Sequence, residues 1–285
     1  SEDLVIEALI TGNTLNVNES ARMHYFQTTV EELASFYWKQ ANALHLELRG
    51  QVANERMPEL LIYGTIGSQR CPDREAVKVW VSNFLGRVGT PPRGRPSVRS
   101  VSAFHATYTA YVIENLMWAS GVRPHGKGLA CLEPVRSMFL VDEKSKGVAA
   151  LRQIPLSVQA STQWAHYQVH RKWVMHFLGL QHCPIFFSVN DKGKVKPLTF
   201  GEVRSVSECS FATNANRHYF CTSLRRAGMT GAEVNALMGH ATLGEELGNR
   251  YGAWDLRKLF AKCTKAIDMW MDADGWLPRE GFGRG

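Results

Sequence analysis

Two arginines, a histidine and a tyrosine occur in short stretches at the ends of apolar, helix-like runs. Arg123 lies in ASGVRPHG, Arg217 lies in NANRHYFCTSLRRAG, and the stretch GHATLGEELGNRY contains both His240 and Tyr251. Taken singly, each residue has an ordinary structural explanation. A basic side chain at a helix end interacts favourably with the helix dipole, and a lone tyrosine is usually a packed aromatic ring. Only their joint occurrence in one chain suggests chemistry.

That chemistry would be the breakage of a phosphodiester bond without a metal ion. The guanidinium groups of Arg123 and Arg217 stay charged at physiological pH and could stabilise the negative charge that develops on the phosphate. The phenol of Tyr251 could attack phosphorus and leave a covalent phosphotyrosine. His240 could donate a hydrogen bond to the phosphate or help to deprotonate Tyr251.

In their order along the chain, these motifs resemble the catalytic domain of the tyrosine recombinases, the phage-integrase family. That family has an arginine after an apolar helix, a lysine in a hairpin, a His-x-x-Arg step, a Gly-His step and then a tyrosine. The resemblance covers about residues 97–271. It implies that Arg123, Arg217, His240 and Tyr251 form a catalytic site and that Tyr251 is the nucleophile.

A hairpin lysine would protonate the departing DNA oxygen. Residues 137–156 contain two apolar runs around a Lys-Ser-Lys-Gly turn, which predicts a β-hairpin. Both Lys144 and Lys146 lie in this turn. We favour Lys146, because its distance along the chain from Arg152 fits the family's hairpin better.

The chain departs from the family pattern at three places and is in this respect divergent. Asn214 stands where the family usually has histidine, no acidic residue follows Arg123 closely, and Tyr251 comes eleven positions after His240. Asn214 could hydrogen-bond a phosphate oxygen but could not carry a proton. We therefore expect acid–base work to rest on His240 and the hairpin lysine.

Composition agrees with a DNA-binding protein that needs no metal. The 33 lysines and arginines exceed the 26 acidic residues, giving a formal charge of +7, which favours a polyanionic partner. His166 and His170 have helical zinc-ligand spacing, but no third ligand is evident, so we expect no metal and no cofactor. The six cysteines show no zinc-like pairing, and no signal peptide or membrane span is evident. We expect reduced thiols and an intracellular location, cytoplasmic or in the nucleoid or nucleus.

Periodicity predicts a mainly helical chain. A segment rich in proline, glycine and arginine, 89–102, is expected to be a linker, and Thr199 is expected to cap a helix after a glycine-containing loop. Helices are expected over 31–48 with Thr29 as N-cap, 73–88, 104–120, 163–180, two segments of 216–240 separated at Gly228, and 255–271.

The expected fold is α+β, mainly helical with a small antiparallel sheet, as in a tyrosine recombinase catalytic domain. We expect a helical N-terminal region, 1–90, that helps to clamp DNA, and a catalytic domain, 91–285. The expected function is site-specific recombination or integration through a 3′-phosphotyrosine intermediate, with a homotetramer acting on paired sites in double-stranded DNA. Three alternatives remain: a type IB topoisomerase-like enzyme, a catalytically inactive DNA-binding protein of the same fold, and an unrelated helical protein.

Overall fold

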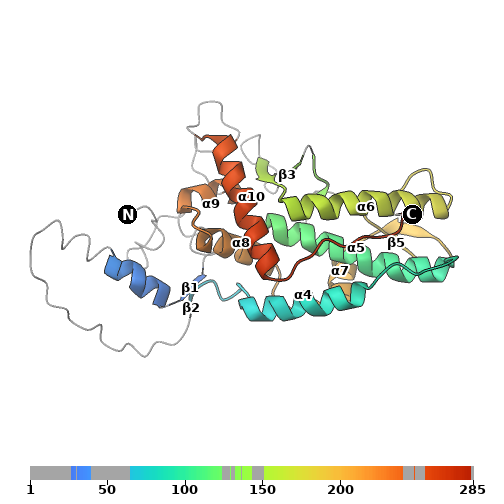
Figure 1. Cartoon of the computed structure of the whole chain (residues 1–285), viewed down its shortest axis with the longest axis horizontal. Coiled ribbons are helices and arrows are strands. Elements are labelled where there is room, and N and C mark those ends of the chain that lie inside the picture. The colour runs from blue at the N-terminus through green and yellow to red at the C-terminus, as the bar shows by residue number, and fades with distance from the viewer. Residues whose placement is uncertain are drawn as a thin grey trace, which may run out of the picture.

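The computed structural model describes residues 27–29, 31–39, 65–123, 129, 132–135, 137–142, 151–239, 247 and 254–283. Within these ranges the chain is mainly helical and has three pairs of short antiparallel strands, which confirms the expected mixture (Figure 1). None of the described helices is both long and apolar enough to cross a membrane. The labelled elements are β1 (Gln27–Thr29), β2 (Thr65–Gly67), α4 (Arg74–Val88), α5 (Val98–Ser120), β3 (Met138–Asp142), β4 (Leu151–Pro155), α6 (Val158–Phe177), β5 (Phe187–Val189), β6 (Val195–Pro197), α7 (Phe200–Ser207), α8 (Ala215–Arg226), α9 (Gly231–Met238) and α10 (Leu256–Ala273).

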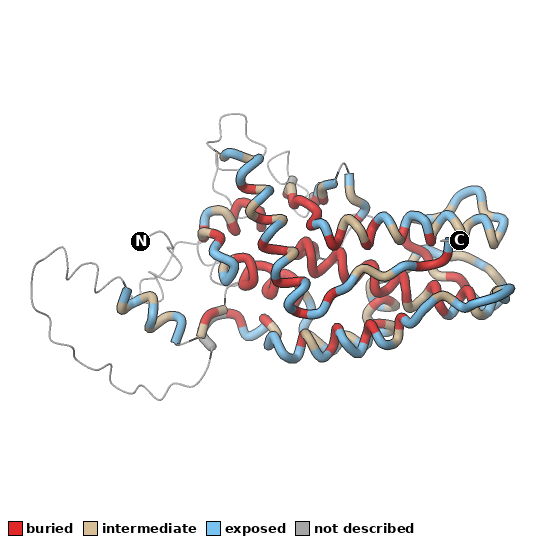
Figure 2. Tube along the Cα trace, in the orientation of Figure 1, coloured by how far each residue is buried: buried red, intermediate tan, exposed pale blue. Residues whose placement is uncertain are grey.

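Helix α5 is the buried centre of the molecule. It packs against α4, α6, α7 and α8, and every side chain from Tyr108 to Ser120 is buried (Figure 2). A helix that is apolar on all sides is expected in such a position. The sequence prediction of a buried helix ending at Gly121 is confirmed, because Gly121 is the left-handed C-cap residue.

The start of α5 corrects the predicted linker. Ser97 and Ser100 form a reciprocal capping box, so the helix begins at Val98 rather than at Phe104. The last five residues of the predicted linker 89–102 therefore belong to a helix. Serine at both positions supplies the side-chain oxygens that satisfy the first free backbone N–H groups.

Helix α6 also begins earlier than its expected start at Gln163. Its N-cap residue is Ser157, and the carboxylate of Asp268 on α10 accepts hydrogen bonds from the backbone N–H groups of Val158 and Gln159, both at 3.1 Å. A carboxylate at a helix N-terminus is stabilising. Because Asp268 is remote in sequence, the local pattern did not indicate this start.

The other predicted helices agree with the structure where it describes them. A helix begins at 31, and the hydroxyl of Thr29 accepts from the N–H of Glu32 at 3.0 Å. Asp73 caps α4, Thr199 caps α7, and α8 and α9 are separated around Gly228. Residues 40–48 of the first predicted helix lie outside the described residues.

The predicted hairpin of residues 137–156 is present as the antiparallel pair β3 and β4, in which Val141 pairs with Arg152. Its turn, with Lys144 and Lys146, lies outside the described residues. The pair of β5 and β6 was not expected, because three-residue strands are too short for an alternating pattern to indicate them.

Helix α4 lies before the predicted domain boundary at residue 90 but shares one hydrophobic core with α5. The ring of Trp80 lies 5.4 Å from that of Trp118, and Phe84 lies 5.4 Å from Tyr111. The division at residue 90 stays a prediction for the region that precedes α4.

Two buried histidines join the C-terminal segment to the core. The backbone N–H of Phe282 donates to Nδ1 of His170 at 3.0 Å, and Nε2 of His170 lies 3.0 Å from Nδ1 of His105. Nε2 of His105 in turn lies 2.8 Å from the carbonyl oxygen of Phe187. Every nitrogen in this series has a suitable partner when both rings are neutral, with the proton on Nε2. A second proton on either ring would place two donors opposite each other.

We predict that this histidine pair makes the protein less stable in mild acid. Burial lowers the pKa of His105 to about 4, from 6.5. Between those values the unfolded chain binds a proton that the native chain does not, so stability falls as the pH decreases from about 6.5 to about 4, by on the order of 3 kcal/mol. Urea unfolding of the wild type and of His105→Gln across this range measures the difference. The difference between their free energies of unfolding should narrow as the pH falls. A constant difference would contradict the conclusion that native His105 is neutral.

Candidate functional site

The side chain of Arg217 bridges the C-terminal ends of two helices. It is only 1% exposed, and it projects from the first turn of α8. Its Nη1 donates to the carbonyl oxygen of Gly121 at 3.3 Å, and its Nη2 donates to that of Met238 at 2.7 Å. Gly121 follows α5 and Met238 ends α9, so one guanidinium group holds both helix ends.

A second buried arginine, Arg152, joins the same two ends. It lies on β4, is 3% exposed, and donates from Nε to the carbonyl oxygen of Leu237 at 2.9 Å. Its Nη2 donates to the carbonyl oxygen of Ser120 at 3.3 Å. We did not select Arg152 as a site residue from the sequence. The available signal was strand alternation, which puts Arg152 on the same face as the fully buried Ile154.

The two arginines suit this position because of the helix dipoles. The last carbonyl groups of a helix lack partners within the helix and carry a partial negative charge equivalent to about half an elementary charge. Two such ends meet at Ser120–Gly121 and Leu237–Met238. The guanidinium groups therefore satisfy the carbonyls and offset the negative ends that would otherwise repel each other.

Arg123 follows one of these helix ends directly. It is half-buried and lies two residues after Gly121, whose carbonyl Arg217 binds. Asn216, beside Arg217, holds this turn by donating from Nδ2 to the carbonyl oxygens of Met117 and Val122 at 3.0 and 2.8 Å. The structure thus brings the backbone next to Arg123 into contact with the side chains at the start of α8.

Asn214 is the N-cap residue of α8 and has left-handed backbone angles, with φ of 67°. Its side chain makes no capping hydrogen bond, and Oδ1 is buried without a hydrogen-bond partner among the described residues. Asn214 lies one turn before Arg217, at the positive end of the helix. The unpaired Oδ1 is a hydrogen-bond acceptor and does not itself indicate an anion, so a contact between Asn214 and phosphate stays a prediction.

The remaining predicted site residues, His240, Tyr251, Lys144 and Lys146, lie outside the described residues. The structure does describe Gly239, which precedes His240 and is the left-handed C-cap residue of α9. It therefore brings together the neighbourhoods of Arg123, Asn214 and Arg217 and the end of α9, and leaves the positions of the histidine, the lysines and the tyrosine as predictions.

The histidine pair with zinc-like spacing serves other contacts. Nδ1 of His166 lies 3.2 Å from the carbonyl oxygen of Arg279, and His170 belongs to the buried pair with His105. No group of His, Cys, Asp and Glu suited to a metal ion occurs among the described residues. The described residues include five cysteines, and all five are free thiols: Cys71, Cys183, Cys209, Cys221 and Cys263.

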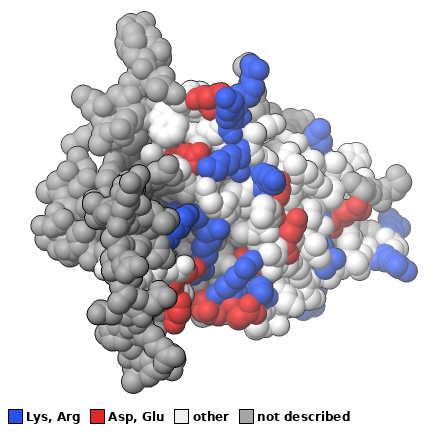
Figure 3. All heavy atoms as spheres, turned by 60° about the vertical axis from the view of Figure 1, so that its left-hand side comes forward, with Lys and Arg blue, Asp and Glu red and all other residues white. Residues whose placement is uncertain are grey.

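Basic and acidic side chains are mixed on the face shown in Figure 3, where lysines and arginines form a band with aspartates and glutamates beside it.

Comparison with family models, with characterised proteins and with solved structures gave no match.

We predict that Gly239→Ala destabilises the protein by about 2–4 kcal/mol, because two costs combine. Gly239 has φ of 69°, and an added Cβ would lie 2.8 Å from Cγ of Arg152. Gly228→Ala is the matched control, because Gly228 has φ of 85° but no atom within 4 Å of an added Cβ. Urea unfolding should show a smaller loss for the control, of about 1–2 kcal/mol. Equal losses would mean that Arg152 does not press against this helix end.

Proposed function

We propose that the protein breaks and rejoins DNA strands as a site-specific recombinase of the tyrosine recombinase type. The observation that carries the proposal is the pair of buried arginines, Arg152 and Arg217, which join the ends of α5 and α9. These ends lead directly to Arg123 and to His240. Arg217 on α8 contacts both helix ends, which lie more than a hundred residues apart in the sequence, and this contact supports the proposal that the three motifs form one site.

In the proposed reaction, Arg123 and Arg217 bind the scissile phosphate, and the phenol oxygen of Tyr251 attacks phosphorus. A bond forms between this oxygen and phosphorus while the bond from phosphorus to the 5′-oxygen breaks. Lys146 gives its proton to the departing 5′-oxygen, and His240 hydrogen-bonds the phosphate or accepts the phenol proton. The 5′-hydroxyl of a partner strand then reverses the step. Asn214 would contribute a hydrogen bond without a proton.

The proposed assembly is a homotetramer on two double-stranded sites, as the family resemblance implies. No metal or cofactor takes part in this scheme, because the two arginines supply the charge that stabilises the transition state. The fold that this proposal assumes is the recombinase catalytic domain, of which the described helices and the β3–β4 pair would be parts.

A second candidate is a DNA-binding protein of this fold that does not cleave. Arg217 is 1% exposed and donates from both Nη atoms to backbone carbonyls. An arginine with a wholly structural role makes contacts of this kind. Together with Asn214 at the position of a family histidine, this favours a non-catalytic protein as the alternative.

We predict a covalent protein–DNA adduct on nicked suicide duplexes that contain the protein's recombination site. The duplexes are drawn from a library of DNA fragments. The adduct should survive denaturation with the wild type and be absent with Tyr251→Phe. Tyr37→Phe is the matched control, because Tyr37 is 49% exposed on the helix 31–39 and should leave the adduct unchanged. Arg123→Ala should slow adduct formation by about a hundredfold or more.

The rival functions predict different results when DNA binding, adduct formation, plasmid relaxation and strand exchange are measured together. DNA binding that weakens steeply with salt, without any adduct, would support the non-cleaving protein and end the catalytic proposal. An adduct formed by monomers that relax supercoiled plasmid would indicate the topoisomerase-like alternative. A tetramer that exchanges strands between paired sites is the result expected here.

A further inference from the structure

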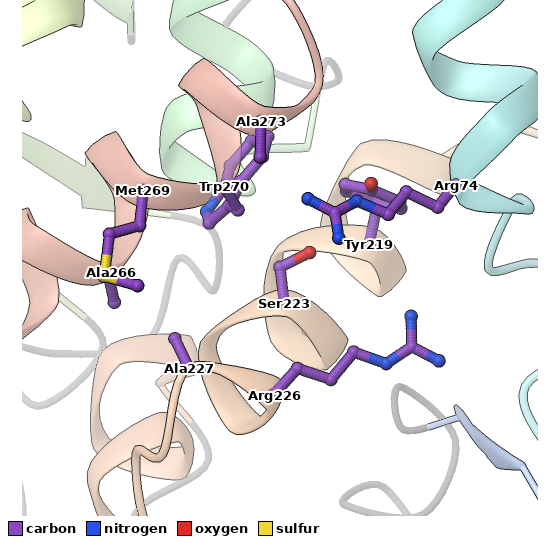
Figure 4. Close-up of a pocket in the computed structure, with 9 residues that line it drawn as sticks. All are labelled: Arg74, Tyr219, Ser223, Arg226, Ala227, Ala266, Met269, Trp270 and Ala273. Carbon is purple, nitrogen blue, oxygen red and sulfur yellow. The ribbon is translucent and has the colours of Figure 1, made fainter.

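A pocket of about 220 Å³ lies between α8 and α10, beside the first turn of α4 (Figure 4). Its α8 wall includes Tyr219, Ser223 and Arg226. Their spacing of four and three residues puts them on one face of the helix. Arg217 turns instead toward the carbonyls of α5 and α9, so the pocket is separate from the site described above.

Hydrogen-bond donors gather at one end of this pocket. Figure 4 shows the hydroxyl of Ser223 directed toward the guanidinium group of Arg74, while the side chain of Arg226 extends away from Ser223 on the side of the pocket opposite Trp270. Ser223 is only 8% exposed, and its hydroxyl makes no hydrogen bond to any part of the chain that the structure describes. Its oxygen is not among the enclosed polar atoms that lack a partner, and Ser223 lines the pocket, so the hydroxyl is free to donate to an oxygen atom in the pocket. This end of the pocket therefore suits an acceptor.

The charges at this end favour an anion with a single negative charge. Nε of Arg74 donates to Asp274 at 2.8 Å, and the hydroxyl of Tyr219 donates to the other oxygen of that carboxylate at 2.6 Å. The carboxylate of Asp274 is fully buried and balances one arginine. Arg226 lies 3.5 Å from Glu32, but both side chains are about half exposed, and such pairs are weak. Each arginine thus has one acidic partner, and the partner of Arg226, Glu32, is exposed enough for one ligand carboxylate to replace it.

The other end of the pocket is apolar. It is formed by α10, with the ring of Trp270 and the side chains of Ala266, Met269 and Ala273. Met269 is 57% exposed, which is unusual for a methionine unless something covers it. The small alanine side chains leave room that a larger residue would fill. The volume is below the range of about 300–1,000 Å³ that is usual for drug-sized ligands, so the occupant should be small.

We propose that this pocket binds a small monocarboxylate with an apolar body. Its carboxylate would accept hydrogen bonds from Arg74, Ser223 and Arg226, and a planar carboxylate matches the paired donors of a guanidinium group. Its apolar body would lie against Trp270 and Met269. The ligand would join α8, which carries Arg217, to α10, and so stabilise the contact between these helices. The proposal does not depend on DNA cleavage.

Calorimetric titration of the full chain with 3-phenylpropionate tests the proposal, with the methyl ester of the same acid as the neutral control. The acid should bind and should raise the thermal unfolding midpoint, and the ester should bind at least about tenfold more weakly. Ser223→Ala and Arg226→Gln should each weaken binding of the acid by about tenfold. Ala273→Leu, a change at an exposed position, should abolish binding by filling the apolar end. Arg257→Gln, an exposed arginine at the start of α10, is the matched control and should have no effect.

Several results would overturn the proposal. These are the absence of binding at about 10 mM acid, equal binding of acid and ester, and an affinity that the Ser223 and Arg226 variants leave unchanged. Tighter binding of inorganic phosphate than of the acid would also overturn it, because the charge argument requires a single negative charge. Thermal melting of each variant without ligand verifies that it is folded. DNA binding and adduct formation are measured separately, so the two proposals can fail independently.

Discussion

The packing of two helix ends against each other depends on two buried guanidinium groups. The C-terminal ends of α5 and α9 both carry partial negative charge, and their last carbonyls would lack partners if the ends met alone. Arg152 and Arg217 donate to four of these carbonyls. Removing an arginine from water costs several kcal/mol, and charge-assisted hydrogen bonds of about 1.5–3 kcal/mol each offset this. The positions of β4, α8 and α9 relative to α5 follow from these contacts.

Other long-range polar contacts fix the outer elements on the apolar core. Asp268 on α10 holds the first N–H groups of α6, and the neutral pair of His105 and His170 holds the C-terminal segment. Asp274, at the end of α10, accepts from Arg74 and Tyr219. Apolar burial is not directional, so it brings helices together without deciding their register. Hydrogen bonds to buried groups do decide it, because an unsatisfied buried donor or acceptor is costly.

The candidate site shows where sequence reasoning stopped. Arg123, Asn214 and Arg217 lie at neighbouring helix ends, and their role in binding phosphate stays a prediction. In the sequence, Arg152 served only as a reference position for choosing between the two hairpin lysines. In the structure it is one of the most deeply buried charged residues described. A buried arginine and an exposed one look alike in a single sequence. Only the face of β4 that it occupies distinguishes them.

The sequence by itself determined the mainly helical class, most helix positions and the hairpin of β3 and β4, because periodicity, capping residues and turn residues act over a few positions. It also determined which residue types are available for phosphate chemistry. Tertiary structure alone decided the early start of α6, the pairing of β5 with β6, and the separate pocket lined by Trp270. It alone also decided that Arg217 bridges two helix ends. The physical reason is that each of these features depends on partners brought together by folding, and a local pattern contains no information about such partners.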